Sequence, residues 1–555
     1  MRNYRFLSVL FSLLLLTVPQ ARSQFRVLET DALRLIYFDL ASDFLVRYTA
    51  RAFHNALDEY RVMFDYEPTE PVTLFMHDLG DYGNAGADAV PRNVINIGMA
   101  PLSYAFETAP ANERINAILL HELIHVLAND KAAGSDKFFR AIFGGKVAVS
   151  DDDPITVLYS FFTAPRRYAP RWYQEGIAVF METWMSGGYG RSLGGYDEMV
   201  FRTRVLEDAP FYDMIGLESE GTADFQVGVN NYLYGPRFMS YLAHEFSPQH
   251  VLDWMNRPFG SKGHFTARFK EVFDSPIFQT WDNWIAFERD FQRSNLERIR
   301  ENPLTAYRDI SARPLGSMSK AFIDPETGEL IAAVRYPGTL AHITAINLAT
   351  GKERKLASIN GPTLFTVSSL AFDSENRRIF YSTNNNRWRD LMMLDLNTGE
   401  TTLLIKNGRI GDLAFNQGDG SLWGVRHSLG FSTIVRIPPP YDQDFQAKTL
   451  EYSYDVYDID ISRDGEWFIG AYVDPTGKQK LVRARTQDVA DGNFEFESLF
   501  NFEESNPEGF VYGSDGASLY GSSYYSGASN IFRYDFADST MKALTNAETG
   551  YFRPI

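Results

Sequence analysis

A tight turn that recurs at a nearly constant interval constrains the second half of this chain more than any other feature. The turns lie in "DPETGEL", "DSENRRI", "QGDGSLW", "SRDGEWF" and "GSDGASL". Their turn residues are spaced 48, 44, 45 and 51 positions apart: Gly328, Asn376, Gly420, Gly465 and Gly516. A repeat of about 40 to 50 residues with four short strands per unit is typical of a β-propeller blade. We therefore expect an all-β propeller over residues 318–555.

A second hairpin supports the same fold. It recurs in "NLATGKE" and "DLNTGET", where Gly351 and Gly399 are again 48 residues apart. The units resemble the propeller repeats of the TolB and dipeptidyl-peptidase type, most clearly in "ISRDGEWFIGAY". An all-β sandwich or solenoid is the alternative fold for this pattern.

The five units are followed by "GYFRPI", which has the pattern of a first strand of a sixth unit. A propeller needs closure to remove its open sheet edges. Two alternatives stay open: this strand closes the ring against an early blade, or the chain is a fragment that ends within the propeller.

Residues 24–300 have a mixed α and β pattern. The segments "LRLIYFD" (33–39), "PVTLFMHD" (71–78) and "NVINIG" (93–98) are typical of strands, and the alternation in the last predicts an exposed or edge strand. Helical spacing appears in residues 41–64 and from Pro110 to Leu127, and later segments are largely helical. Residues 301–317 contain two prolines and little periodicity, which indicates a linker. The expected fold class is multidomain, with an α+β domain followed by an all-β propeller of five or more blades.

The first 23 residues have the pattern of a secretory signal peptide. "MRNYRF" supplies two arginines, "LSVLFSLLLLTV" is an apolar core of 12 residues, and Ala21 and Ser23 are small residues suited to cleavage. That core is too short to span a membrane. An N-terminal anchor helix is the alternative. We expect an exported protein of the bacterial periplasm or cell surface.

Charge and cysteine content narrow the chemistry. The formal net charge of −18 disfavours nucleic acid and anionic lipid as partners, apart from any local basic patch. The chain has no cysteine, so it has no disulfide and no N-terminal lipid attachment through a thiol. A metal site here would depend on histidine and carboxylate ligands.

"ILLHELIHVLAND" (118–130) contains the motif H-E-x-x-H at His121, Glu122 and His125. Residues i and i+4 share a helix face, so two imidazoles can bind one ion and Glu122 can reach a water on it. A catalytic zinc ion needs three protein ligands and one open position. A chance string on an ordinary buried helix is the alternative, and a third ligand would decide between them.

The candidate third ligand is Glu175 in "RWYQEGIAVFMETW" (171–184). Together with H-E-x-x-H, its "EGIA" resembles the gluzincin metallopeptidases, which include thermolysin and the zinc aminopeptidases. The resemblance implies that Glu175 binds zinc and that Glu182, two helical turns further on, orients a ligand histidine. The alternatives are a helix-start carboxylate for Glu175 and a surface carboxylate for Glu182.

"NNYLYGPRFMSYLAHEF" (230–246) resembles the Y-x-x-G segment of the same family. The resemblance implies that Tyr232 donates to the oxyanion, with Tyr234 in reserve; two core aromatics are the alternative. It also implies peptide hydrolysis with Zn²⁺ as cofactor and Glu122 as the base. "NVINIG" would then pair with the substrate backbone.

The chain departs from the family pattern at two places. In "NIGMAP", Ala100 follows Met99 where the aminopeptidases carry a glutamate that binds the free amine, which favours an endopeptidase. In addition, 49 residues separate His125 from Glu175. This insert contains "DKFFRAIFGGK" and "YSFFTAPRRYAPRW", which suit a lid, a membrane-surface contact, a partner site or a packed excursion.

Two functions therefore compete. The first is an exported zinc endopeptidase of peptide or protein substrates, in which the propeller docks or gates the substrate. The second is a periplasmic or cell-surface binding scaffold, in which the propeller binds a partner and the peptidase-like domain is inactive.

Overall fold

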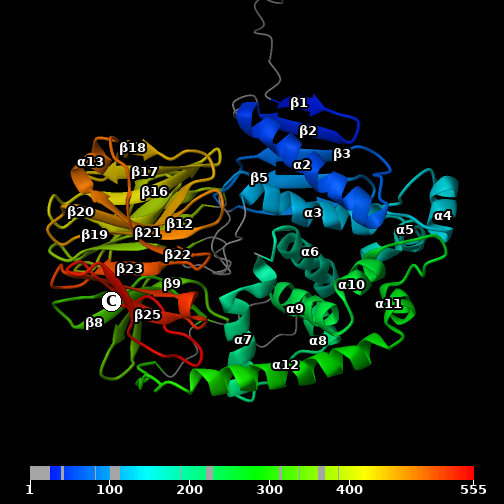
Figure 1. Cartoon of the computed structure of the whole chain (residues 1–555). Coiled ribbons are helices and arrows are strands. Elements are labelled where there is room, and N and C mark those ends of the chain that lie inside the picture. Colours follow the sequence, from blue (N-terminus) through cyan, green and yellow to red (C-terminus); the bar gives the residue numbers. More distant parts are fainter. Residues whose placement is uncertain are drawn as a thin grey trace, which may run out of the picture.

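This computed structural model describes residues 25–38, 43–81, 83–100, 113–188, 190–219, 229–311, 316–336, 338–360, 369–385 and 387–555. The chain is multidomain: a largely helical N-terminal region with one mixed sheet lies beside a C-terminal five-bladed β-propeller (Figure 1). Within the described residues, we find no helix that combines the length and the apolar character needed to cross a membrane. The signal sequence expected at residues 1–23 lies outside the described residues.

The N-terminal sheet has five strands in the order β1-β2-β3-β5-β4. The strands are β1 (Phe25–Glu29), β2 (Leu33–Phe38), β3 (Val72–His77), β4 (Ala85–Asp88) and β5 (Val94–Gly98). The inner strands β2, β3 and β5 are parallel, whereas β1 and β4 are antiparallel to their neighbours. The prediction that "NVINIG" is an edge strand is wrong, because β5 lies between β3 and β4. The edge strand β4 was not predicted because "AGAD" has no apolar alternation.

Two long helices cover this sheet, and the other helices pack beneath them (Figure 1). The long helices are α2 (Asp43–Phe64) and α3 (Arg114–Asp130). The others are α4 (Ser135–Phe143), α5 (Thr156–Thr163), α6 (Arg171–Met185), α7 (Gly195–Leu206), α8 (Met214–Glu218), α9 (Asn230–Glu245), α10 (Pro248–Met255), α11 (Phe265–Phe273) and α12 (Ile277–Ile299). Large buried aromatic side chains fill their core, among them Trp172, Tyr234, Phe238, Trp281 and Trp284. The expected helix start at Pro110 lies outside the described residues, and α3 begins at Arg114 with Glu113 as its N-cap.

The propeller consists of five antiparallel sheets in sequence order. The first contains β6 (Ser317–Met318), β7 (Phe322–Ile323), β8 (Glu329–Arg335), β9 (His342–Asn347) and β10 (Glu353–Ser358). The next two contain β11 (Leu370–Asp373), β12 (Arg378–Asn384), β13 (Arg389–Asp395) and β14 (Thr401–Ile405), then β15 (Ile410–Phe415), β16 (Leu422–Ser428), β17 (Phe431–Ile437) and β18 (Phe445–Thr449). The last two contain β19 (Asp455–Ile461), β20 (Trp467–Val473), β21 (Gln479–Arg485) and β22 (Glu497–Glu503), then β23 (Glu508–Tyr512), β24 (Ser518–Ser523), β25 (Asn530–Asp535) and β26 (Thr540–Ala543). Helix α13 (Thr486–Ala490) follows β21.

The five predicted turns lie between β7 and β8, β11 and β12, β15 and β16, β19 and β20, and β23 and β24. Four of them place the predicted glycine at a positive φ, as at Gly465 (φ 78°), a conformation that costs glycine little. In the second blade the positive φ falls one residue later than predicted, at Arg377 (φ 54°). The turn at Gly351 lies between β9 and β10, and the turn at Gly399 lies between β13 and β14. The all-β propeller pattern is therefore confirmed.

The C-terminal segment lies beside the fifth blade and reaches the first. Gly550 forms a parallel bridge with Ser529, but residues 551–555 form no strand, so the strand expected in "GYFRPI" is absent. Instead, the Arg553 side chain donates to the Met318 carbonyl oxygen and forms an ion pair with Glu508. One side chain therefore links β23 of the fifth blade to β6 of the first.

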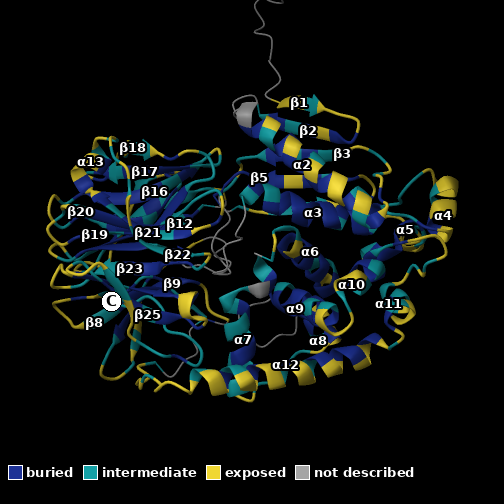
Figure 2. Cartoon of the chain, viewed as in Figure 1, coloured by how far each residue is buried: buried dark blue, intermediate teal, exposed yellow. Residues whose placement is uncertain are grey.

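The segment between the two parts of the chain is attached to the fifth blade. Helix α12 ends at Ile299 and β6 begins at Ser317, so the predicted 301–317 linker lies between them except for its last residue, which belongs to β6. Thr305 N donates to Asn546 O at 3.1 Å, and Asn546 N donates to Thr305 Oγ1 at 2.9 Å. Figure 2 shows buried residues in the cores of both parts.

Candidate metal centre

Helix α3 carries the H-E-x-x-H motif and is held at its N-terminus. The Glu113 carboxylate caps the helix by accepting from Ile115 N at 3.1 Å and Asn116 N at 2.9 Å. The same carboxylate accepts from Tyr48 Oη at 2.6 Å and, from the propeller, Tyr452 Oη at 2.9 Å. An acceptor at this position satisfies helix N–H groups that otherwise have no partner. The propeller therefore contacts the first turn of the helix that bears the candidate ligands.

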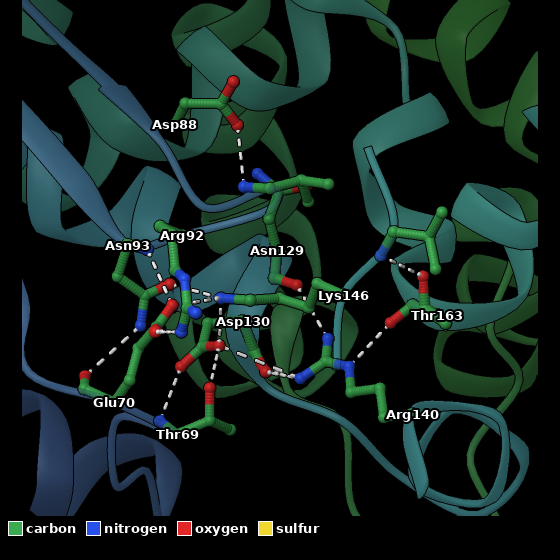
Figure 3. A network of polar contacts seen from close by, with 12 residues as sticks. Thr69, Glu70, Asp88, Arg92, Asn93, Asn129, Asp130, Arg140, Lys146 and Thr163 are labelled. Carbon is green, nitrogen blue, oxygen red and sulfur yellow. Dashed lines mark hydrogen bonds and ion pairs between the residues drawn. The ribbon is translucent and has the colours of Figure 1, made fainter. Parts of the chain in front are cut away.

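The C-terminus of α3 is held by a buried polar network (Figure 3). Asp130 is fully buried and accepts from Lys146 Nζ at 2.7 Å and from Thr69 N at 2.8 Å. Burial alone would raise the pKa of Asp130, but Lys146 and Thr69 lower it. Arg140 donates to the backbone oxygens of Asp130 and Thr163, at 2.6 and 2.7 Å. These bonds fix both the end of α3 and the base of the insert that follows it.

The structure brings the three predicted metal ligands together. His121 Nε2 and His125 Nε2 on α3 are 3.1 Å apart, and each lies 3.4 Å from Glu175 Oε2 on α6. Ligand atoms about 2.05 Å from a tetrahedral zinc ion are about 3.3 Å from one another. The three atoms therefore have the spacing of one face of a zinc tetrahedron. Among the described residues, this is the only such group of three or more histidine, aspartate or glutamate side chains.

Glu182 and Arg191 fix the orientation of His121. His121 Nδ1 lies 2.8 Å from Glu182 Oε2, and Arg191 donates to both Glu182 oxygens at 2.6 Å. Since the carboxylate can only accept, Nδ1 carries a proton and donates it to Glu182, and Nε2 is the ring nitrogen that faces the ligand cluster. Arg191 Nη2 also lies 3.0 Å from Nδ1, but both atoms are then donors, so we read this contact as packing.

The electrostatics of the cluster favour a cation. Burial would lower the pKa of His121, but Glu175 and Glu182 raise it to about 9. Burial would likewise raise the pKa of both carboxyl groups, yet the imidazoles hold that of Glu175 well below its usual range, and Arg191 and His121 lower that of Glu182 to about 2. Two ionised carboxylates, the buried Glu182 and the partly buried Glu175, therefore converge on the imidazoles, a donor set suited to a divalent ion.

Glu122 lies beside the ligands with one oxygen unpaired. Its side chain is buried, and burial raises its pKa. Within the described residues, Glu122 Oε2 and Glu175 Oε2 are buried oxygens without a hydrogen-bond partner. The first is free to accept a proton, and the second is one of the three candidate ligand atoms.

Two glycines bring Tyr232 to the cluster. A Cβ on Gly176 would lie 2.7 Å from Gly235 Cα, and a Cβ on Gly235 would clash with Trp172 O. The absence of both side chains lets α6 and α9 approach closely, as small residues at a helix crossing do. The first turn of α9 then places the Tyr232 ring in stacked orientation 6.4 Å from the His121 ring. Burial and the Glu175 charge raise the pKa of Tyr232, so it remains a hydrogen-bond donor.

Tyr234, the residue predicted in reserve, occupies a different environment. It is fully buried and packs against Phe201 and Trp284, with ring centroids 5.0 and 5.9 Å away. The core alternative therefore describes Tyr234, whereas Tyr232 lies at the ligands.

Sequence reasoning missed Arg191 and the contact between Glu113 and Tyr452. Arg191 follows the glycine-rich "GGYG", which by itself indicates only a turn. Tyr452 lies 339 positions from Glu113. No local pattern reports either contact, because each depends on how distant elements pack.

The insert between His125 and Glu175 forms a lobe of α4 and α5. Its rings form a cluster: the Phe139 and Phe162 rings are stacked with centroids 4.5 Å apart, and the Phe143 and Tyr159 rings are tilted with centroids 4.6 Å apart. The base of the lobe is anchored through Arg140, and large apolar side chains of the lobe are exposed. These are Phe138, Ile142, Phe143, Val149, Ile155, Val157, Leu158, Phe161 and Tyr168.

Comparison with known proteins finds only remote structural likenesses. A scan against protein-family models finds no match, and a search of curated proteins finds none. The chain is similar to TolB from Acinetobacter baumannii (12% identity, TM-score 0.34, covering 41% of this chain and 53% of that one). It is also similar to an oligogalacturonate lyase in complex with manganese (14% identity, TM-score 0.30, covering 41% of this chain and 64% of that one). A puromycin-hydrolyzing peptidase of Mycobacterium tuberculosis is similar as well (15% identity, TM-score 0.31, covering 44% of this chain and 41% of that one).

The chain thus spans 53% and 64% of the lengths of the first two proteins. At these TM-scores the likenesses carry no argument about function, and the blades rest on the strand pairing itself.

Proposed function

We propose that this chain is a zinc-dependent peptidase of the gluzincin type, acting as an exported endopeptidase. The observation that carries the proposal is the spacing of 3.1, 3.4 and 3.4 Å among ligand atoms of His121, His125 and Glu175. Two helices separated by the long insert supply these atoms, so the grouping is a product of the fold rather than of the motif alone.

The residues around the ligands suit hydrolysis of an amide bond. A zinc ion, when bound, would polarise the scissile carbonyl and make a water molecule more acidic. Glu122 would accept the proton of that water and transfer it to the leaving amine. Tyr232 would donate a hydrogen bond to the oxyanion that develops on the carbonyl oxygen. Glu182 and Arg191 would keep His121 oriented.

The substrate backbone would pair with β4 rather than with β5. Strand β4 ends the sheet on the side of α3, and its Gly86 has open space where a Cβ would lie. A free sheet edge can accept an extended peptide as an added strand. The loop before β4 is bound to the propeller through Arg409 and Asp81, at 2.6 Å. We propose that the propeller holds the β4 edge in place and limits which substrates reach it.

The test compares purified wild-type protein with Glu122→Gln. Wild type should contain one zinc ion per chain by metal analysis and cleave internally quenched peptides. Glu122→Gln should keep its zinc and lose about 10²- to 10⁴-fold in kcat, the usual contribution of a general base. Wild type without stoichiometric zinc, or a variant with unchanged hydrolysis, would contradict the proposal.

The alternative is a binding scaffold in which the propeller binds a partner protein. Five complete blades occupy much of the chain and favour it, since propellers commonly bind other proteins. A stable partner recovered with the full chain, together with no cleavage of any peptide offered, would support the scaffold over the peptidase.

A further inference from the structure

A partly buried arginine outside the predicted site lies behind the metal ligands. Arg191 is in the short 3-10 helix Arg191–Leu193, and its Nε and Nη2 each donate to one oxygen of Glu182 at 2.6 Å. Glu182 Oε2 in turn accepts from His121 Nδ1 at 2.8 Å. A guanidinium has only donors and stays charged, so both Glu182 oxygens accept from Arg191. Glu182 therefore stays ionised and also accepts from His121 Nδ1.

The same guanidinium contacts Tyr232, the predicted hydrogen-bond donor to the oxyanion. Arg191 Cζ lies 5.6 Å from the centroid of the Tyr232 ring, within the range of a cation–π interaction. The Tyr232 ring is stacked on the His121 ring, with 14° between the planes. Arg191 therefore touches Tyr232 directly and reaches His121 through Glu182.

A local feature of the backbone places Arg191. A Cβ on Gly190 would lie 2.5 Å from Thr183 Oγ1 and 2.8 Å from Thr183 Cα, so only glycine lets the chain fold back onto α6 here. Ser192 completes the contact: its N donates to Thr183 Oγ1 at 3.2 Å, and its Oγ donates to Val179 O at 3.3 Å. The loop is thus docked on the helix that carries Glu175 and Glu182.

We infer that Arg191 is a positioning residue for both halves of the site, orienting the ligand His121 through Glu182 and supporting the Tyr232 ring directly. The inference rests on the proposed function, because it takes His121, His125 and Glu175 to be zinc ligands. It adds a residue that no H-E-x-x-H motif contains and predicts that zinc affinity depends on it.

The experiment measures the zinc dissociation constant of the full chain by chelator competition, without any peptide. Arg191→Gln and Glu182→Gln should each weaken zinc binding about tenfold or more, the usual cost of losing a partner of a ligand histidine. The double variant should bind zinc about as tightly as whichever single variant binds it less tightly, because both substitutions interrupt the same chain of hydrogen bonds. Arg191→Lys, which keeps the charge but loses the paired donors, should fall between Arg191→Gln and wild type.

A spectroscopic readout separates positioning from general stability. With Co²⁺ in place of zinc, Arg191→Gln should change the visible absorption bands, because the ligand geometry changes. Arg237→Gln is the matched control: Arg237 also binds a buried carboxylate through two bonds, to Glu288 at 2.9 Å each. It should lower the melting temperature but leave zinc affinity and the cobalt spectrum unchanged.

The outcomes are distinguishable. If wild type and Arg191→Gln bind zinc equally and give the same cobalt spectrum, the role of Arg191 is overturned while the peptidase proposal stands. If wild type binds no zinc, both are overturned. Should Arg191→Gln not fold, Arg191→Lys and Glu182→Gln carry the same comparison, and wild-type affinity in both would refute the inference.

Discussion

Two tyrosines in one turn of α9 show how strongly the environment of a residue decides its role. Tyr232 stacks on the candidate ligand His121, whereas Tyr234 is fully buried among aromatic rings. The sequence contains both within "NNYLYG" and offers no local signal that separates them. Their difference follows from the helix face on which each lies.

Replacing each tyrosine by phenylalanine tests this assignment. Tyr232→Phe removes the donor at the oxyanion and should lower kcat about 10²- to 10³-fold, with KM and zinc content nearly unchanged. Tyr234→Phe should leave kcat within about twofold of wild type. Steady-state kinetics on a quenched peptide make the comparison, and a larger loss in Tyr234→Phe than in Tyr232→Phe would refute it.

An aspartate in the propeller should make folding stability depend on pH. Burial and the nearby Asp458 raise the pKa of Asp412 to about 6. Because the folded-state pKa lies above the unfolded one, the contribution of Asp412 to stability is fully present below about pH 4 and is lost as the pH rises through 6. Two pKa units correspond to at most about 3 kcal/mol.

Asp412→Asn should remove this part of the pH dependence, since asparagine keeps the oxygen that accepts from Asp458 N at 3.1 Å. Urea unfolding at pH 4 and pH 7 gives the measurement. Equal slopes of stability against pH in wild type and variant would show that Asp412 does not titrate as stated.

At the scale of elements, the crossing of α6 and α9 builds the site. Helix α6 supplies Glu175 and α9 supplies Tyr232, and the two helices meet at Gly176 and Gly235. In the sequence, the glycines of "EGIA" and "YLYG" belong to the two segments that resemble the gluzincin metallopeptidases. The structure gives their physical reason, which is the close approach of two backbones.

Gly235→Ala should force α6 and α9 apart, because the added Cβ would clash with Trp172 O. We expect a loss of about 3 kcal/mol in the free energy of unfolding, typical of severe overpacking, and weaker zinc binding as α6 moves. Gly86→Ala is the control, since its Cβ would have nothing within 4 Å. Chemical denaturation compares the two, and a Gly235→Ala protein as stable as Gly86→Ala would contradict the argument.

At the scale of the whole molecule, the propeller is bonded to two elements of the candidate site. Tyr452 binds the cap of α3, and Arg409 forms ion pairs with Asp78 at 2.7 Å and Asp81 at 2.6 Å, in the loop before β4. Both carboxylates are nearly or fully buried. The two parts of the chain should therefore unfold together rather than separately.

Arg409→Ala leaves two buried carboxylates without their main partner, a change that typically costs about 3 to 5 kcal/mol. We expect differential scanning calorimetry to show a lower melting temperature and two resolved transitions in place of one. Arg354→Ala, which removes an ion pair between an exposed guanidinium and the partly buried Glu329, should change little. A single unshifted transition in Arg409→Ala would show that the interface does not couple the two parts.

The sequence alone determined the features that depend on local spacing. The period of the turns predicted the blades, the i, i+4 spacing placed His121 and His125 on one helix face, and apolar runs placed β2, β3 and α2. These patterns are readable because helices and strands repeat over a few residues. The "EGIA" motif also named Glu175, which the structure brings within 3.4 Å of both imidazoles.

The tertiary structure alone decided which side of the sheet is open, which tyrosine meets the ligands and which residues support them. Strand β4 replaces β5 at the edge, Arg191 orients Glu182, and Tyr452 reaches Glu113 across 339 positions. Each outcome depends on contacts between segments far apart in the chain. Such contacts are selected by the packing of whole elements, for which no short stretch of sequence carries a signal.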